Sequence, residues 1–132
     1  MDLVGRKMMD SGEAAFALMD ELEADIEAAK DAHPMMANAL WNALATLRET
    51  TEWVTKQDMN DRFAGAVAYQ RAFSRVLGGV FHLRAALSGD ATRINLARFY
   101  MTMLLPEHAS LCVQAKAGAD VLYTLEVDDF AA

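Results

Sequence analysis

The 132-residue chain is poor in the residues that crosslink or interrupt a fold. Its one cysteine, Cys112, excludes an internal disulfide and, with no signal-peptide pattern at Met1, favours a reducing, cytoplasmic compartment. No apolar run approaches the roughly 20 residues that a membrane-spanning helix needs, so no membrane partner is predicted. Only two prolines occur, and good helix formers such as Ala, Met, Leu and Glu are abundant. These features predict one soluble helical domain.

Motifs that carry chemistry are also scarce. The three histidines, His33, His82 and His108, lie far apart, and none belongs to the Glu-x-x-His pair that is typical of di-iron bundles. The chain has no glycine-rich phosphate loop and no Gly-x-Ser-x-Gly nucleophile motif. We therefore predict no catalytic, cofactor-binding or metal-binding residues in this chain. His108 and Cys112 share a helix face, which fits either an activated thiol or a buried small thiol beside a surface imidazole.

The charge is unevenly distributed along the chain. The net charge of −7 argues against a nucleic-acid partner. Residues 62–98, the basic segment, hold six arginines and one acid, Asp90, whereas the segments on either side are acidic. The segments could neutralise one another across a bundle, or some of the arginines could face a partner protein or a phosphate.

Apolar residues recur at steps of three and four over most of the chain, which predicts amphipathic helices. Four helices are expected, over residues 11–32, 34–57, from Asp58 or Asn60 to 88, and 90–125. Their connections are short, so we predict an all-α, up-down-up-down four-helix bundle that forms a single domain over residues 1–132. Residues 1–10 would be a junction segment and residues 126–132 a frayed tail. Arg48 and Glu52 have the spacing of an ion pair within the second helix.

Local signals mark the ends of these helices. Asp10 and Glu13 have the spacing of a capping box at the first helix. Pro34 suits the first position of the second helix, where its missing N–H costs nothing. Gly89 suits a left-handed stop after the third helix, and Asp90 an N-cap of the fourth.

Two features oppose helix formation in the second half of the chain. Gly78 and Gly79 lie within the third helix, where two glycines cost about 2 kcal/mol relative to alanine. Close approach of a neighbouring helix or a ligand would offset that cost. Pro106 lies within the fourth helix and costs about 3 kcal/mol there, because it removes one backbone hydrogen bond and clashes with the Thr102 carbonyl. We expect a kink near Pro106, or a break into two helices.

The third helix carries a polar stripe with a glycine notch, because polar or small residues repeat along it at four-residue steps. It could be a solvated face, a docking face for another protein domain, or a direct phosphate or cofactor contact. We treat it as a candidate contact with another domain or subunit, and its residues are Gln70, Arg71, Ser74, Arg75, Gly78, Gly79 and His82.

Four segments, in this order, resemble one known family. Residues 69–87 (YQRAFSRVLGGVFHLRAAL) and 97–106 (ARFYMTMLLP) look like consecutive helices of a C-terminal domain found in one branch of the acyl-CoA dehydrogenases. These are the longer enzymes of the 3-methylmercaptopropionyl-CoA dehydrogenase type. Residues 2–7 (DLVGRK) look like the junction that precedes this domain, and residues 117–125 (AGADVLYTL) resemble its closing segment.

The resemblance implies FAD-dependent α,β-dehydrogenation of an acyl-CoA thioester, a reaction of fatty acid metabolism, in the full-length enzyme. The family's catalytic carboxylate is a glutamate in a Tyr-Glu-Gly segment upstream of the junction, and this chain has no Tyr-Glu-Gly. FAD would therefore be bound elsewhere in the full enzyme. The helical domain would pack against the catalytic body or another subunit, and a homo-oligomer is compatible with that role.

Three functional interpretations follow. The chain could be the C-terminal domain of an acyl-CoA dehydrogenase, a free-standing helical interaction module, or an unrelated bundle that binds a small ligand. An apolar face left uncovered would favour the first interpretation, with self-association as its symptom. A highly soluble monomer would favour the second.

Overall fold

The computed structural model describes residues 12–118, apart from the side chains of Met59 and Phe63. These residues form helices and turns without any strand, which confirms the predicted all-α bundle. The helices are α2 (Glu13–Ala29), α3 (Pro34–Thr55), α4 (Met59–Ala64), α5 (Ala66–Ala86), α6 (Ala91–Met103) and α7 (Glu107–Ala115). Within this part of the chain, no helix is both long enough and apolar enough to cross a membrane.

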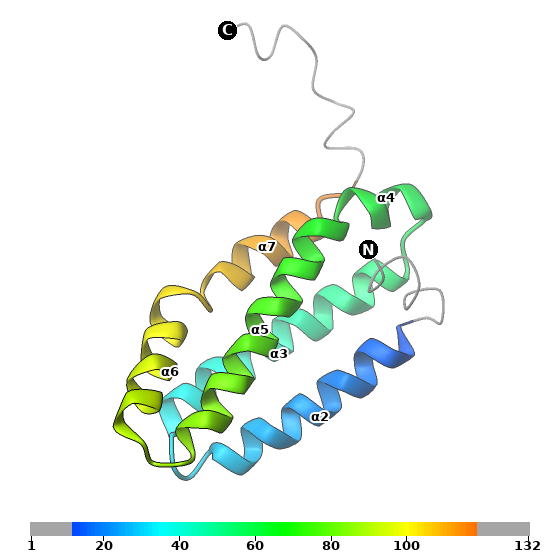
Figure 1. Cartoon of the computed structure of the whole chain (residues 1–132). Coiled ribbons are helices and arrows are strands. Elements are labelled where there is room, and N and C mark those ends of the chain that lie inside the picture. Colours follow the sequence, from blue (N-terminus) through cyan, green and yellow to red (C-terminus); the bar gives the residue numbers. More distant parts are fainter. Residues whose placement is uncertain (1–11, 119–132) are drawn as a thin grey trace, which may run out of the picture.

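The long helices run alternately up and down the bundle (Figure 1). Helices α2 and α3 are neighbours, and α6 and α7 follow one another along the side of α5 that faces away from α2 (Figure 1). Helix α5 contacts α2, α3, α6 and α7, so it is the central element of the bundle. The predicted junction (residues 1–10), the capping residue Asp10 and the tail (residues 126–132) lie outside the described residues.

The first two helices follow their apolar periodicity closely. The predicted stripe of α2 is buried at Met19, Leu22 and Ile26, whereas Phe16 is only half-buried. Helix α3 begins at Pro34, as predicted, and buries its own stripe. Helix α2 is shorter than expected, because it begins after Gly12 and ends at Ala29. The chain then turns before α3 begins.

The predicted third helix is two helices. Helix α4 ends at Ala64, and α5 begins after Gly65. A side chain at Gly65 would collide with the backbone carbonyl of Ala115 on α7, so the glycine permits a close approach between these two segments. Of the two predicted caps of this segment, Asp58 is used: its Oδ1 accepts a hydrogen bond from the Asp61 amide at 3.0 Å.

The fourth helix is also divided, so the single helix with a kink near Pro106 is not observed. Helix α6 ends at Met103, and α7 begins directly after Pro106. The amides of Leu104 and Leu105 both donate to the Tyr100 carbonyl at 2.9 Å, which closes the helix before the proline. Because Pro106 has no N–H to continue the helical ladder, the chain restarts there as a new helix. Helix α7 then ends at Ala115, earlier than the predicted end at residue 125.

The predicted stop and cap between α5 and α6 are confirmed. Gly89 has a φ of +79°, and the Arg93 amide donates to Asp90 Oδ2 at 3.2 Å. The expected ion pair between Arg48 and Glu52 is not formed. The Arg48 Nη2 atom instead contacts two carboxylates of α2, Asp20 at 2.8 Å and Glu23 at 2.6 Å. This arginine therefore joins two helices rather than two turns of one helix.

A candidate contact surface on α5 and α6

The glycine pair of the candidate stripe lies where α6 packs on α5. A Cβ atom built on Gly78 would lie 2.5 Å from the Tyr100 hydroxyl oxygen, and one on Gly79 would lie 2.6 Å from Leu40 Cδ2. The Tyr100 hydroxyl donates a hydrogen bond to the Arg75 carbonyl at 2.7 Å. The close approach predicted from the two glycines is therefore made by Tyr100 on α6 and by Leu40 on α3.

The polar end of the stripe also contacts Tyr100. The imidazole ring of His82 lies against the Tyr100 ring, with the ring centroids 4.8 Å apart and the planes inclined by 34°. Burial raises the pKa of Tyr100, and the positively charged side chain of Arg75 opposes that shift. Gly78, His82 and Tyr100 thus form one packed contact between α5 and α6.

The arginines of the stripe are held by a carboxylate on α7. Glu107 Oε1 lies 3.1 Å from Arg71 Nη2 and 3.1 Å from Arg75 Nε. The hydrogen bond to Glu107 raises the pKa of Arg75. Arg84, farther along α5, lies 3.7 Å from Asp25 of α2. These pairs support the interpretation in which oppositely charged segments neutralise one another across the bundle.

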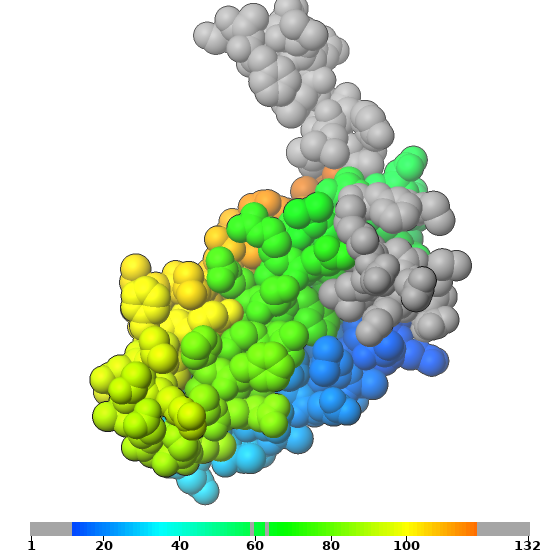
Figure 2. Space-filling model, in the orientation of Figure 1, coloured from blue at the N-terminus to red at the C-terminus, as the bar shows by residue number. Residues whose placement is uncertain are grey.

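Some residues of the predicted stripe therefore pack inside the bundle, and others face solvent. Gly79 is buried, Gln70, Arg75, Gly78 and His82 are partly buried, and Arg71 and Ser74 are exposed. Only part of the polar stripe is free to contact another molecule. On the face shown in Figure 2, the surface of α5 lies between that of α2 and that of α6 and α7.

Sequence reasoning missed an apolar stripe on the outer side of α6. Leu96, Phe99 and Met103 are 51%, 57% and 62% exposed, and their spacing of three and four places them on one helix face. Phe81 on the neighbouring helix α5 is 55% exposed. The spacing of the α6 stripe was visible in the sequence. Its exposure was not, because the same periodicity is typical of a core-facing helix.

Helix α6 packs along α5 but buries few of its own residues. Of its 13 residues, only Ala97 and Tyr100 are buried. Helix α5, by contrast, buries nine residues along its 21-residue length. The side of α6 that packs on the bundle thus buries only two residues, and the α6 stripe lies on its exposed side. Adjacent exposed apolar side chains of this kind are typical of surfaces that contact another protein.

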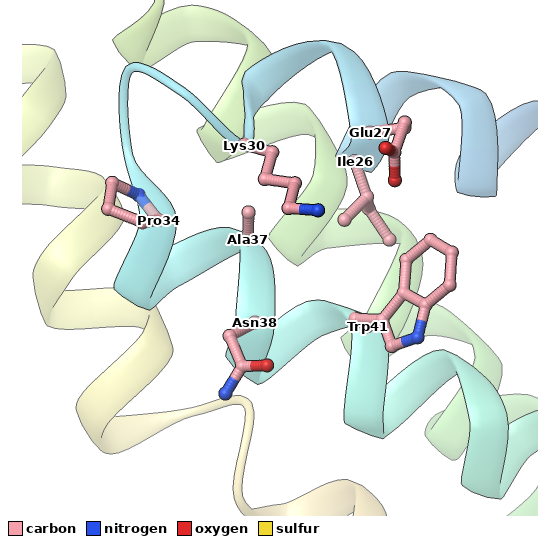
Figure 3. Close-up of a pocket in the computed structure, with 7 residues that line it drawn as sticks. All are labelled: Ile26, Glu27, Lys30, Pro34, Ala37, Asn38 and Trp41. Carbon is pink, nitrogen blue, oxygen red and sulfur yellow. The ribbon is translucent and has the colours of Figure 1, made fainter.

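A groove of about 390 Å³, the Trp41 groove, lies between α2 and α3 (Figure 3). Pro34 and Trp41 lie at its opposite ends, with Ile26 and Lys30 between them (Figure 3). A neighbouring hollow of about 550 Å³ is lined by Trp41 and by three carboxylates, Asp20, Glu23 and Glu27. Such a lining repels phosphates, so this second hollow does not fit the diphosphate of a flavin dinucleotide.

The activated-thiol interpretation of Cys112 is contradicted. The side chain is 1% exposed, and burial raises its pKa, while a hydrogen bond with Thr50 and the charge of Lys116 oppose that shift. The His108 ring does not contact the thiol but lies with Nδ1 2.7 Å from the Leu105 carbonyl oxygen. Cys112 is therefore a small core residue between α7 and α3. Among residues 12–118, no group of three or more His, Cys, Asp and Glu side chains could hold a metal ion.

One comparison with known proteins gives a match. A family model described as "Acetyl-CoA dehydrogenase C-terminal like" matches residues 18–126. No curated protein and no solved structure matches the chain. The matched range includes the candidate contact stripe on α5, the apolar stripe on α6 and the Trp41 groove.

Proposed function

Because the chain belongs to the acetyl-CoA dehydrogenase C-terminal-like family, we propose that it is the C-terminal helical domain of an FAD-dependent acyl-CoA dehydrogenase-like oxidoreductase. The four motifs of residues 2–7, 69–87, 97–106 and 117–125 favour the 3-methylmercaptopropionyl-CoA dehydrogenase type. In this role the bundle packs against the catalytic body or another subunit. The alternative role is that of a free-standing helical interaction module.

The observation that carries the proposal is the uncovered apolar stripe of α6. Leu96, Phe99 and Met103 each expose more than half of their surface, and α6 buries only Ala97 and Tyr100. Fully burying a side chain of this size contributes about 1.5–3 kcal/mol. A catalytic body that covered the stripe would stabilise both the interface and α6 itself. Phe81 on the neighbouring helix α5 is a further exposed apolar side chain.

The catalytic body would supply the chemistry. It would bind FAD, which accepts the hydride in α,β-dehydrogenation, and it would hold the carboxylate that removes the α-proton. The bundle would shape or cover the entrance to the active site and support oligomerisation. Its own contribution would be surface contact, because the paired arginines on α5 already bind Glu107 within the bundle.

The first experiment is to sequence the source DNA upstream of Met1 and to purify the complete polypeptide that it encodes. If the frame continues into a flavin-binding body that ends in Tyr-Glu-Gly, Phe99→Asp is introduced into α6 of that protein. A matched variant, Ala45→Asp, places the same charge on an exposed position of α3. Flavin content, acyl-CoA oxidation and molar mass by light scattering are then measured.

We expect Phe99→Asp to lower the oligomer mass or the acyl-CoA oxidation rate, and Ala45→Asp to change neither. Equal behaviour of both variants and the parent protein would exclude the α6 stripe as the docking surface. Full activity and assembly after deletion of the bundle would contradict the proposed role as a whole. A stop codon directly before Met1, together with no binding to a catalytic body, would favour the free-standing module.

A further inference from the structure

A third hollow, of about 510 Å³, lies where the start of α3 meets α6, and we name it the Arg98 pocket. One wall comes from the α2–α3 turn and the first residues of α3, and the other from the C-terminal half of α6. These walls are more than 50 residues apart in the sequence, so no local motif predicts the pocket. None of the residues of the α6 stripe lines it, which separates it from the proposed docking surface.

The walls of the pocket are mainly apolar and adaptable. Met35, Met36 and Met101 line it together with Pro34 and Ala39. Methionine side chains are unbranched and polarizable, so they adjust to apolar ligands of different shapes. The lining contains no Phe, Tyr or Trp, and its one ring, the His33 imidazole, lies with Nε2 3.2 Å from the Ala86 carbonyl oxygen.

The charge of the pocket comes from one side chain. Arg98 is the only Lys, Arg, Asp or Glu residue that lines it. Arg98 is exposed, and no carboxylate within residues 12–118 forms an ion pair with it, in contrast to Arg71 and Arg84 on α5. The hydroxyl-bearing Thr102 lies on the same wall of α6. An arginine beside apolar walls favours an anion and disfavours a cation.

We propose that the Arg98 pocket binds a small amphipathic carboxylate, with its apolar chain against the three methionines and its carboxylate against Arg98 and Thr102. A guanidinium binds a carboxylate through two parallel N–H donors, which a neutral head group cannot accept in the same way. The pocket has no lining carboxylate that would repel such a ligand. This site goes beyond the proposed docking role and does not depend on it.

The test uses octanoate and 1-octanol, which share one apolar chain and differ in charge. Both are added to the chain labelled with ¹³C in its methionine methyl groups, and binding is followed from the methyl resonances in NMR spectra. Single Met→Leu variants assign the Met35 and Met101 resonances. Arg98→Ala removes the charge of the pocket. Arg93→Ala is the matched control, because Arg93 is another exposed arginine of α6 and does not line the pocket.

We expect octanoate to shift the Met35 and Met101 methyl resonances, and Arg98→Ala to weaken octanoate binding by about fivefold, as for a partly solvated ion pair. Binding of 1-octanol should be unchanged by Arg98→Ala, and Arg93→Ala should affect neither ligand. The proposal is overturned if octanoate shifts neither methyl group, or if Arg98→Ala and Arg93→Ala weaken octanoate binding equally. If the folded Arg98→Ala variant bound neither octanoate nor 1-octanol, the role assigned to the guanidinium would also be overturned.

Discussion

The phenol ring of Tyr100 on α6 occupies the space that a side chain at Gly78 on α5 would need. A Cβ at residue 78 would lie 2.5 Å from the hydroxyl oxygen and 3.0 Å from Cζ of that ring. The hydroxyl is held in place by its hydrogen bond to the Arg75 carbonyl. The glycine therefore costs helix propensity within α5 but permits the contact that attaches α6 to the bundle.

Gly78→Ala should destabilise the chain, although alanine is the better helix former by about 1 kcal/mol. The added methyl group must displace the Tyr100 hydroxyl, and overpacking of this kind costs about 1–3 kcal/mol. We expect a net loss of up to about 2 kcal/mol in urea unfolding followed by circular dichroism. In a Tyr100→Phe background, which lacks the hydroxyl, Gly78→Ala should be less harmful. A stabilising effect of Gly78→Ala in the parent chain would show that Tyr100 moves away freely.

The buried hydroxyls of Thr51 and Tyr69 should respond asymmetrically to mutation. They lie 2.7 Å apart, and Thr51 also donates to the Leu47 carbonyl at 2.8 Å. Tyr69→Phe leaves Thr51 with its Leu47 partner and should cost about 0.5–1.5 kcal/mol. Thr51→Val leaves the Tyr69 hydroxyl buried without its acceptor and should cost about 1–3 kcal/mol. Urea unfolding of both variants checks the order, and a larger cost for Tyr69→Phe would contradict it.

Tyr69 should also make the fold sensitive to alkaline pH. Burial raises the pKa of Tyr69 well above the ordinary tyrosine value, and the hydrogen bond with Thr51 only partly opposes this. The folded state therefore retains a proton that the unfolded state releases above about pH 10, so this contribution to stability is complete below that pH and is lost above it. The difference in unfolding free energy between the parent and Tyr69→Phe should be constant up to about pH 9 and should shrink above about pH 10. A constant difference would mean that Tyr69 ionises equally in both states.

Cys112 should react slowly with thiol reagents in the folded chain. Its burial raises the thiol pKa and excludes the reagent. Modification by Ellman's reagent should require opening of α7, so urea should accelerate it strongly. His108→Ala should leave the rate unchanged, since the His108 ring contacts the Leu105 carbonyl. A marked slowing in His108→Ala would restore the imidazole as an activator of the thiol.

Features that act within one or two helical turns could be predicted from the sequence. Pro34 starts α3, Asp90 caps α6 and Gly89 takes the left-handed conformation, because each effect depends on the residue itself and its nearest neighbours. The apolar stripes of α2 and α3 likewise identified the core side of each helix. The resemblance carried by residues 69–87 and 97–106 indicated the family before any tertiary contact was known.

Tertiary packing decided where helices are interrupted and which charges meet. Gly65 separates α4 from α5 because the backbone of α7 passes close to it, and that neighbour is 50 residues away in the chain. Arg48 reaches α2 rather than Glu52, and Glu107 holds two arginines of α5, because those carboxylates approach only once the helices are packed.

The candidate surfaces also combine features that the sequence predicts with features that only the packing of the helices decides. The sequence by itself determined that the segment after Asp90 is helical and that Arg98 carries a positive charge. It could not determine that Leu96, Phe99 and Met103 remain uncovered, or that Arg98 lies beside methionines from the start of α3. Periodicity assigns residues to the faces of a helix, whereas only the packing of the other helices determines which face is buried and which is left exposed.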